Sequence, residues 1–200
     1  MVRIGLTGGI AAGKSVAARR FGELGAVVID HDVLAREAVA DGSVGLRWIT
    51  ETFGDGVLDA EGALDRAALG AVVFGDPVAR ERLNAIVHPQ VRRLSAEREA
   101  AAREAGAETV VHDIPLLVET HQGESFDVLV VVHTPAEERL RRLTAGRGMN
   151  EVDAQARIDA QASDDERLAA ADVVLDGTGS EENLRRQVDD FWADRVTTPG

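Results

Sequence analysis

The chain contains 200 residues, 44% of them hydrophobic, which is enough for one domain with a buried core. Its formal net charge of −13 argues against general binding of nucleic acids or anionic membranes, because both require a basic surface. No segment approaches the ~20 apolar residues of a membrane span, so we expect a cytoplasmic protein without a membrane partner.

Short apolar runs alternate with helical patterns along most of the chain. The first helical patterns lie at 14–24 and 33–39. Five runs have the length and composition of buried strands, at 2–6, 26–29, 109–111, 128–132 and 173–175. Strands that alternate with helices are typical of a parallel sheet covered on both faces. We therefore predict a three-layer α/β/α fold with a central five-stranded parallel sheet.

The stretch at about 43–106 interrupts this alternation, because it contains only helical patterns. The patterns lie at 67–74, 77–87 and 89–104, and we expect the pair His88-Pro89 to end the second of them. We interpret the stretch as a helical lobe inserted between the second and third strands of a single domain, 1–200. A cationic, glycine-containing segment at about 139–150 has the features of a lid that closes over phosphates.

A phosphate-binding motif follows the first strand. Gly8 to Ser15 matches G-x-x-x-x-G-K-[ST] in full, between a predicted strand and a predicted helix. In such a P-loop, backbone N–H groups surround the phosphates and the helix N-terminus stabilises their charge. The predicted phosphate-binding residues are Gly8, Gly9, Ile10, Ala11, Ala12, Gly13, Lys14 and Ser15, with the adjoining Val16. Lys14 would contact the β- and γ-phosphates, and the Ser15 hydroxyl would bind Mg²⁺.

Lys14 is the only lysine in a chain with 22 basic residues. A compositional preference for arginine would have replaced it as well, and a guanidinium fork does not substitute for the compact ammonium at this position. A GTPase would also carry an N/T-K-x-D guanine signature, which needs a second lysine. We therefore predict that the P-loop binds ATP and that the protein transfers the terminal phosphoryl group to a small molecule.

Carboxylates follow two of the predicted strands at the sheet edge that the P-loop shares. Asp30 and Asp32 come after the second strand. Asp32 could act as general base toward an acceptor hydroxyl, help to hold Mg²⁺, or cap the helix at 33–39. Asp113 comes after the third strand and could contact Mg²⁺ through water, touch the acceptor, or be a plain turn residue. His88 taken alone is more typical of a structural histidine at a helix end.

Four arginines lie close together at positions 139, 141, 142 and 147. Some of them are expected on a solvated helix face. We select Arg139 and Arg147 as the functional pair, because a cation that closes over the transferred phosphoryl group accelerates such reactions by ~10³–10⁵.

Six segments of the chain resemble the dephospho-CoA kinase family. They are IGLTGGIAAGKS (4–15), VIDHDVLAREAV (28–39), FGDGVLDAEGALDR (53–66), LNAIVHP (83–89), DIPLLVE (113–119) and AQASDDERLAAADVVLDGTG (160–179). The segments cover nearly the whole chain, and DIPLLVE and LN..VHP are specific to that family. The resemblance implies ATP-dependent phosphorylation of the ribose 3′-hydroxyl of dephospho-CoA, which gives CoA and ADP in the last step of coenzyme A synthesis.

The resemblance also implies roles for individual residues. Asp32 becomes the general base, Arg139 faces the phosphates, Arg147 lies in the lid, and the helical insert becomes the CoA-binding lobe. The implied acceptor-binding residues are Asp32, Asp65, Arg66, His88, Asp113, Leu116, Leu117 and Glu119. The family's aspartate-asparagine pair near the last strand is Asp176-Gly177 here, so contacts to ATP at Gly177 and Thr178 would come from the backbone.

Two other functions remain open at this stage. Another P-loop kinase would use a nucleoside, a nucleotide or a shikimate-like acceptor, and a regulatory module would bind ATP without transferring phosphate. The sequence is compatible with a monomer or a small homo-oligomer.

Overall fold

The computed structural model describes residues 1–120 and 125–195. The chain forms two compact units, one made of Met1–Asp30 with Ala101–Gly200 and the other of His31–Ala100. The second unit begins directly after the second strand and contains most of the stretch at about 43–106 that was predicted to form an inserted lobe. No helix within these described residues combines the length and the apolar character that crossing a bilayer requires.

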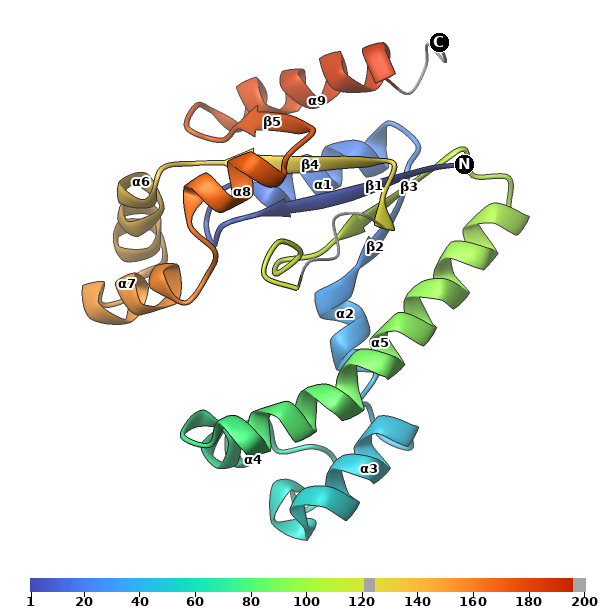
Figure 1. Cartoon of the computed structure of the whole chain (residues 1–200), viewed down its shortest axis with the longest axis vertical. Coiled ribbons are helices and arrows are strands. Elements are labelled where there is room, and N and C mark those ends of the chain that lie inside the picture. The colour runs from blue at the N-terminus through green and yellow to red at the C-terminus, as the bar shows by residue number, and fades with distance from the viewer. Residues whose placement is uncertain (121–124, 196–200) are drawn as a thin grey trace. The chain divides into compact units, whose positions relative to one another are not determined.

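The first unit is built around one parallel sheet of five strands in the order β2-β3-β1-β4-β5 (Figure 1). The strands are β1 (Val2–Gly8), β2 (Val27–Asp30), β3 (Thr109–Asp113), β4 (Val128–His133) and β5 (Val173–Asp176). Each of the five predicted strands is present, and each extends one or two residues further toward the carboxyl end than the apolar run. The predicted α/β fold is confirmed, with β1 as the central strand.

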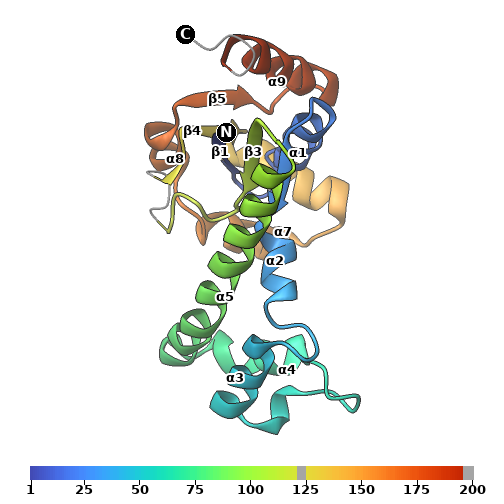
Figure 2. The same cartoon turned by 90° about the vertical axis from the view of Figure 1, so that its right-hand side faces the viewer.

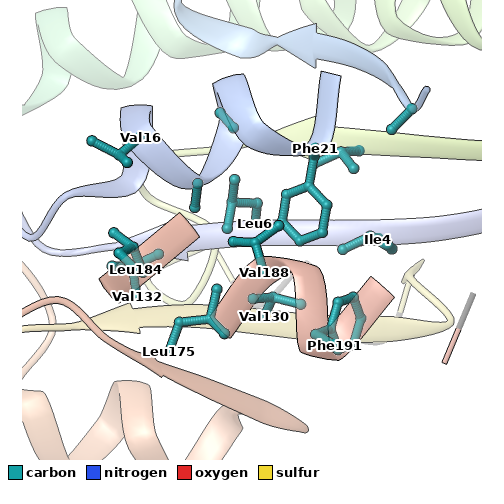
Figure 3. Packing of buried hydrophobic residues seen from close by; sticks show 14 of the residues in the cluster. Ile4, Leu6, Val16, Phe21, Val130, Val132, Leu175, Leu184, Val188 and Phe191 are labelled. Atoms are coloured by element: carbon teal, nitrogen blue, oxygen red, sulfur yellow. The ribbon is translucent and has the colours of Figure 1, made fainter. Parts of the chain in front are cut away.

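One face of this sheet is covered by α1 (Lys14–Glu23) and α9 (Glu181–Arg195). Figure 3 shows how their apolar side chains meet those of the strands, with Phe21 and Val188 gathered around Leu6 and Val130. The rings of Phe21 and Phe191 meet edge to face, with centroids 5.9 Å apart. This geometry is favourable for aromatic pairs and fixes the spacing of the two helices.

The opposite face is covered by the segment that follows β3 and by α8 (Asp164–Ala170). Ile114 and Leu117 pack there with Leu129 and Val131 of β4. The predicted three-layer arrangement is therefore present. Between β4 and α8 the chain forms α6 (Ala136–Arg141), a π turn at Arg142–Gly146 and α7 (Glu151–Asp159). The lid predicted at about 139–150 falls in this region and stays a prediction.

The second unit is helical (Figure 2), and its apolar side chains form a core of their own. Its elements are α2 (His31–Glu37), α3 (Val44–Phe53), a 3₁₀ turn at Asp55–Val57, α4 (Arg66–Phe74) and α5 (Pro77–Glu104). Ile49 of α3, Val57 and Leu69 of α4 are buried together with apolar side chains of α5. One short antiparallel bridge, between Leu58 and Leu64, was not expected from the helical patterns.

The prediction that His88-Pro89 ends a helix is wrong, because α5 runs through Pro89 without interruption. A proline inside a helix removes one N–H hydrogen bond and introduces a steric clash, but packing of the surrounding turns can offset that cost. Val87 and Val91, on either side of Pro89, both pack against the core of the second unit. Tertiary contacts thus maintain a helix that the local sequence predicted to break.

Candidate functional site

The P-loop forms the turn between β1 and α1, as its motif predicts. Gly13 has φ 107° and Ala11 has φ 61°, and these left-handed conformations let the backbone curl. The N–H of Ala12 donates to Gly9 O at 3.0 Å and closes the turn. No side chain caps α1, so the first N–H groups of this helix are available to an anion.

Lys14 and Asp113 meet beside the P-loop. The Lys14 ammonium donates to Oδ1 of Asp113, and both side chains are largely buried, with 18% and 9% exposed. Asp113 is the last residue of β3 and lies in register with Leu6 of β1 and Asp30 of β2. The pair therefore sits at the carboxyl edge of the sheet, where ligands bind in open α/β sheets. Asp113 is thus an ionic partner of the P-loop lysine and not a plain turn residue.

Arg139 lies against the beginning of the P-loop, and only 2% of it is exposed. Its Nε donates to Thr134 O at 2.9 Å and its Nη2 donates to Oδ1 of Asp164 at 2.8 Å. A Cβ on Gly9 would lie 2.6 Å from Nη1, so the guanidinium group lies in close contact with the backbone of Gly9. Within the described residues, Nη1 is buried and has no hydrogen-bond partner. Because buried donors are normally satisfied, an anionic oxygen at the P-loop would complete this site.

Arg167 is a second buried arginine at the same place, and the sequence reasoning missed it. It is 3% exposed, donates to Ala162 O, and contacts Oδ1 of Asp164 at 3.2 Å. Its Nη2 would lie 3.0 Å from a Cβ on Gly9. Burial and, after it, the nearby charge of Arg139 lower the pKa of Arg167. Two guanidinium groups thus concentrate positive charge beside the P-loop of an acidic protein, which attracts polyanions.

Arg142, in the π turn, connects the P-loop with the loop after β5. It donates to Ala11 O at 3.2 Å and to Gly177 O at 2.6 Å. A cavity of about 300 Å³ adjoins these contacts, and it is lined by Gly13, Val16, Arg142 and Gly177 among others. This group brings the predicted nucleotide-binding residues Val16 and Gly177 together. Sequence reasoning had preferred Arg147 to Arg142, yet Arg147 is exposed and follows the π turn.

Gly177 and Thr178 are held by the backbone around β5. A Cβ on Gly177 would lie 2.2 Å from Ala12 O and 2.4 Å from Thr134 Oγ1, so the P-loop can approach only a glycine here. The N–H and the hydroxyl of Thr178 both donate to Oδ1 of Asp176, at 2.8 and 2.7 Å. These two hydrogen bonds are the main cause of the lowered pKa of Asp176. The loop after β5 is thereby fixed beside the P-loop.

The predicted acceptor residues in the segment after β3 differ in their burial and in their contacts. Leu117 is fully buried in the core, which leaves its side chain a packing role, whereas Leu116 is exposed. Glu119 accepts a hydrogen bond from Ala162 N at 2.8 Å and lies 3.9 Å from Nη1 of Arg167. Glu119 therefore lies beside Arg167, one of the two buried arginines at the P-loop.

Four predicted acceptor-binding residues lie in the second unit. Asp32 is exposed in the first turn of α2, which begins at His31, so Asp32 does not occupy the capping position that was considered for it. Asp65 caps α4 by accepting from Ala67 N and Ala68 N, at 2.9 and 3.0 Å. Arg66 and His88 are exposed, on α4 and α5. Their roles toward an acceptor stay predictions.

A divalent cation would have to rely on few protein ligands. No group of three or more His, Cys, Asp or Glu side chains among residues 1–120 and 125–195 could hold a metal on its own. Mg²⁺ commonly takes one or two protein oxygens and otherwise uses phosphate oxygens and water. The exposed hydroxyl of Ser15, in the first turn of α1 and next to Lys14, fits that mode of binding.

Comparison with known proteins agrees with this geometry. The family model for dephospho-CoA kinase matches residues 2–183. A dephospho-CoA kinase of Leifsonia xyli is 53% identical over 194 residues, which cover 96% of this chain and 98% of the relative. A dephospho-CoA kinase of Mycobacterium tuberculosis is 53% identical over 196 residues, which cover 98% of this chain. The chain spans about half, 48%, of the length of this relative and of the other mycobacterial relatives that are 53% identical to it.

Solved structures give the same result. A protein from Thermus thermophilus superposes with a TM-score of 0.83 at 35% identity, covering 98% of both chains. A dephospho-CoA kinase from Campylobacter jejuni superposes with a TM-score of 0.73 at 26% identity, covering 98% of this chain and 97% of the other. The P-loop, the strand order and these matches together show that the chain belongs to the dephospho-CoA kinase family.

Proposed function

We propose that this protein transfers the γ-phosphoryl group of ATP to the ribose 3′-hydroxyl of dephospho-CoA, giving CoA and ADP. The observation that carries the proposal is the Lys14–Asp113 pair at the P-loop, within a chain that the dephospho-CoA kinase family model matches almost throughout. Asp113 belongs to the DIPLLVE segment, so the family-specific part of the sequence directly contacts the phosphate-binding lysine.

The roles of the residues follow from their chemistry. The orphan N–H groups at the start of α1 would bind the β- and γ-phosphates, and Lys14 would leave Asp113 partly or wholly for a phosphate oxygen. Arg139 would use its unsatisfied Nη1 toward the transferred group, whose charge spreads over its oxygens during transfer. Mg²⁺, held by Ser15 and the phosphates, would neutralise charge on the β- and γ-oxygens. The cavity beside Arg142 and Gly177 would hold the adenine base.

The acceptor side of the proposal rests on Asp32. This carboxylate follows Asp30, the last residue of β2, by two positions. We propose that it takes the proton of the ribose hydroxyl as general base. Asp65, Arg66, His88 and Leu116 are proposed to contact dephospho-CoA. We also propose a cytoplasmic monomer or small homo-oligomer that acts on these two small molecules without a nucleic-acid or membrane partner.

The test is an ADP-release assay on the purified chain with ATP, Mg²⁺ and a panel of acceptors. Dephospho-CoA should support turnover with CoA as the chromatographically identified product, whereas shikimate, nucleosides and nucleotides should not. Turnover with one of those other acceptors and none with dephospho-CoA would refute the proposed acceptor. ATP binding without any acceptor product would indicate a regulatory module.

Asp32→Asn separates the two roles considered for that residue. The base role predicts that kcat falls about 100-fold or more while the affinity for ATP stays within a factor of about three. Asp41→Asn, at an exposed position in the same unit, is the control and should behave like wild type. A collapse of ATP affinity in Asp32→Asn would instead place this carboxylate in the metal site.

A further inference from the structure

One amide of the P-loop is already bound by a side chain from far along the chain. The N–H of Ile10 donates to Oε1 of Gln161 at 2.8 Å, across 151 positions. Ile10 directly follows Gly9, against which the guanidinium groups of Arg139 and Arg167 lie. The first half of the P-loop is therefore held by side chains of the region between β4 and β5.

Gln161 itself is fixed in place by its neighbours. It lies in the short junction between α7, which ends at Asp159, and α8, whose capping residue Ser163 forms a reciprocal capping box with Glu166. The backbone N–H of Gln161 donates to Ile158 O at 3.1 Å. The next residue, Ala162, donates to Glu119 and accepts from Arg167. A side chain on so constrained a backbone loses little further freedom when it binds.

The contact with Ile10 also decides which way the carboxamide is turned. An N–H donor can meet only the carbonyl oxygen of the glutamine, so the NH₂ group must occupy the other position. In the part of the chain that the structure describes, Nε2 of Gln161 has no hydrogen-bond partner. Gln161 and Arg139 both line a cavity of about 470 Å³, whose wall also includes Asp159, Asp164 and Glu166, and Nη1 of Arg139 is buried without a partner among the described residues. The carboxamide of Gln161 lies at Ile10 and Nη1 of Arg139 lies at Gly9, so both side chains can donate to an anionic oxygen bound at the first half of the P-loop.

We propose that Gln161 bridges the P-loop and the γ-phosphoryl group: its oxygen holds the Ile10 amide, and its NH₂ group donates to a γ-phosphoryl oxygen. The side chain then has two functions, since it positions the P-loop and touches the transferred group. This inference rests on the proposed function insofar as a nucleoside triphosphate is the donor. It does not depend on the identity of the acceptor.

Two substitutions separate the two functions. Gln161→Leu removes both hydrogen bonds, and Gln161→Glu keeps an oxygen acceptor for Ile10 but replaces the NH₂ donor by negative charge. Amide hydrogen exchange at Ile10 should accelerate in Gln161→Leu and remain close to wild type in Gln161→Glu. The affinity for a non-hydrolysable ATP analogue should fall about tenfold in Gln161→Leu, the equivalent of one hydrogen bond to a charged group, and further in Gln161→Glu. The affinity for ADP, which lacks the γ-phosphoryl group, should change less than about threefold in both variants.

Gln155→Leu is the matched control. Gln155 is an exposed glutamine of α7 that bonds only Asp159, at 2.7 Å, among the described residues. Its replacement should leave exchange at Ile10 and both nucleotide affinities unchanged.

A purely structural role for Gln161 would lower the affinities for ADP and the ATP analogue equally and would accompany a lower melting temperature. That result, or unchanged exchange at Ile10 in Gln161→Leu, would overturn the proposal. The measurements need no acceptor, so they stand even if dephospho-CoA proves not to be the substrate. Conversely, a wild-type protein that shows the predicted difference between the affinities for ADP and the ATP analogue, and yet does not phosphorylate dephospho-CoA, would contradict the proposed acceptor alone.

Discussion

The ammonium group of Lys14 donates to the carboxylate of Asp113, a residue 99 positions further along the chain. This contact joins the P-loop to the segment DIPLLVE at 113–119. It holds the ammonium group at the sheet edge before nucleotide binds. The Lys14 side chain therefore loses less conformational entropy when a phosphate binds to it. The charge of Lys14 is balanced by one carboxylate that a phosphate oxygen can replace.

Lys14→Arg should lower kcat about 100-fold or more, although the charge is retained. The reason is geometric, because a planar guanidinium fork cannot occupy the place of a compact ammonium beside Asp113. Steady-state phosphorylation kinetics measure the effect. Arg19→Lys, the reverse exchange at an exposed position of the same helix, should leave kcat unchanged. Near-normal activity of Lys14→Arg would mean that only the charge matters.

Arg139→Lys should lower kcat about 10³-fold, because lysine cannot bond Thr134, Asp164 and the transferred group at the same time. It should also reduce stability, since Asp164 loses one of its two arginine partners. The kinetic loss should exceed what the fraction of unfolded protein explains, as circular dichroism of the same samples can establish. Arg147→Lys, at an exposed position, provides the comparison. If Arg147→Lys proved the more damaging change, the lid arginine chosen from the sequence would be the catalytic one.

Gly177→Ala should destabilise the protein by about 1–3 kcal/mol, the usual cost of overpacking. The added methyl group would lie 2.2 Å from Ala12 O, so the P-loop must shift and ATP affinity should fall as well. Urea unfolding and nucleotide titration measure the two effects. Gly146→Ala, where a methyl group would meet open space, should leave stability unchanged or raise it by up to about 1 kcal/mol. Equal behaviour of the two variants would contradict the tight contact at Gly177.

The acid sensitivity of the fold should depend in part on Glu23. Hydrogen bonds from Arg185 and then Arg20 lower the pKa of this carboxyl group from 4.5 to about 2, and the bond from Arg185 connects α1 with α9. A lowered pKa in the folded state means that the stabilisation is present above pH 4.5 and is lost as the pH falls toward 2. In Glu23→Gln the unfolding midpoint should vary less steeply with pH over that interval.

Salt provides an independent check of the same interaction. The groups are solvent-exposed, so added salt should weaken the contribution of Glu23. Asp194→Asn, at an exposed position of α9, serves as control and should keep the wild-type pH dependence. An identical pH profile for Glu23→Gln would show that the ion pairs do not stabilise the fold.

The strands and the P-loop were predictable because their signals are local. Apolar runs such as 128–132 mark a strand buried on both faces, and the eight residues from Gly8 to Ser15 specify their own turn. The prediction that a helix ends at Pro89 was wrong, because the packing that maintains α5 involves residues of other helices. Arg167 and Gln161 lie in the segment 160–179 that carries the resemblance, but the local sequence does not reveal their contacts with Gly9 and Ile10, which span more than 150 positions. Residues that act through such distant contacts become visible only in the folded chain.

The position of β1 at the centre of the sheet has a consequence for the order in which the protein can form. Both neighbours of β1 lie about a hundred or more positions later in the chain, and the side chain that holds Ile10 comes later still. During synthesis the nucleotide-binding turn is therefore made first but cannot acquire its native surroundings until the last third of the sequence has left the ribosome. Contacts between residues so far apart in the sequence slow folding, because the intervening chain loses conformational entropy before the native contacts can form. Nascent chains that stop before residue 128 should accordingly fail to retain ATP on an affinity resin, even though they carry the whole motif.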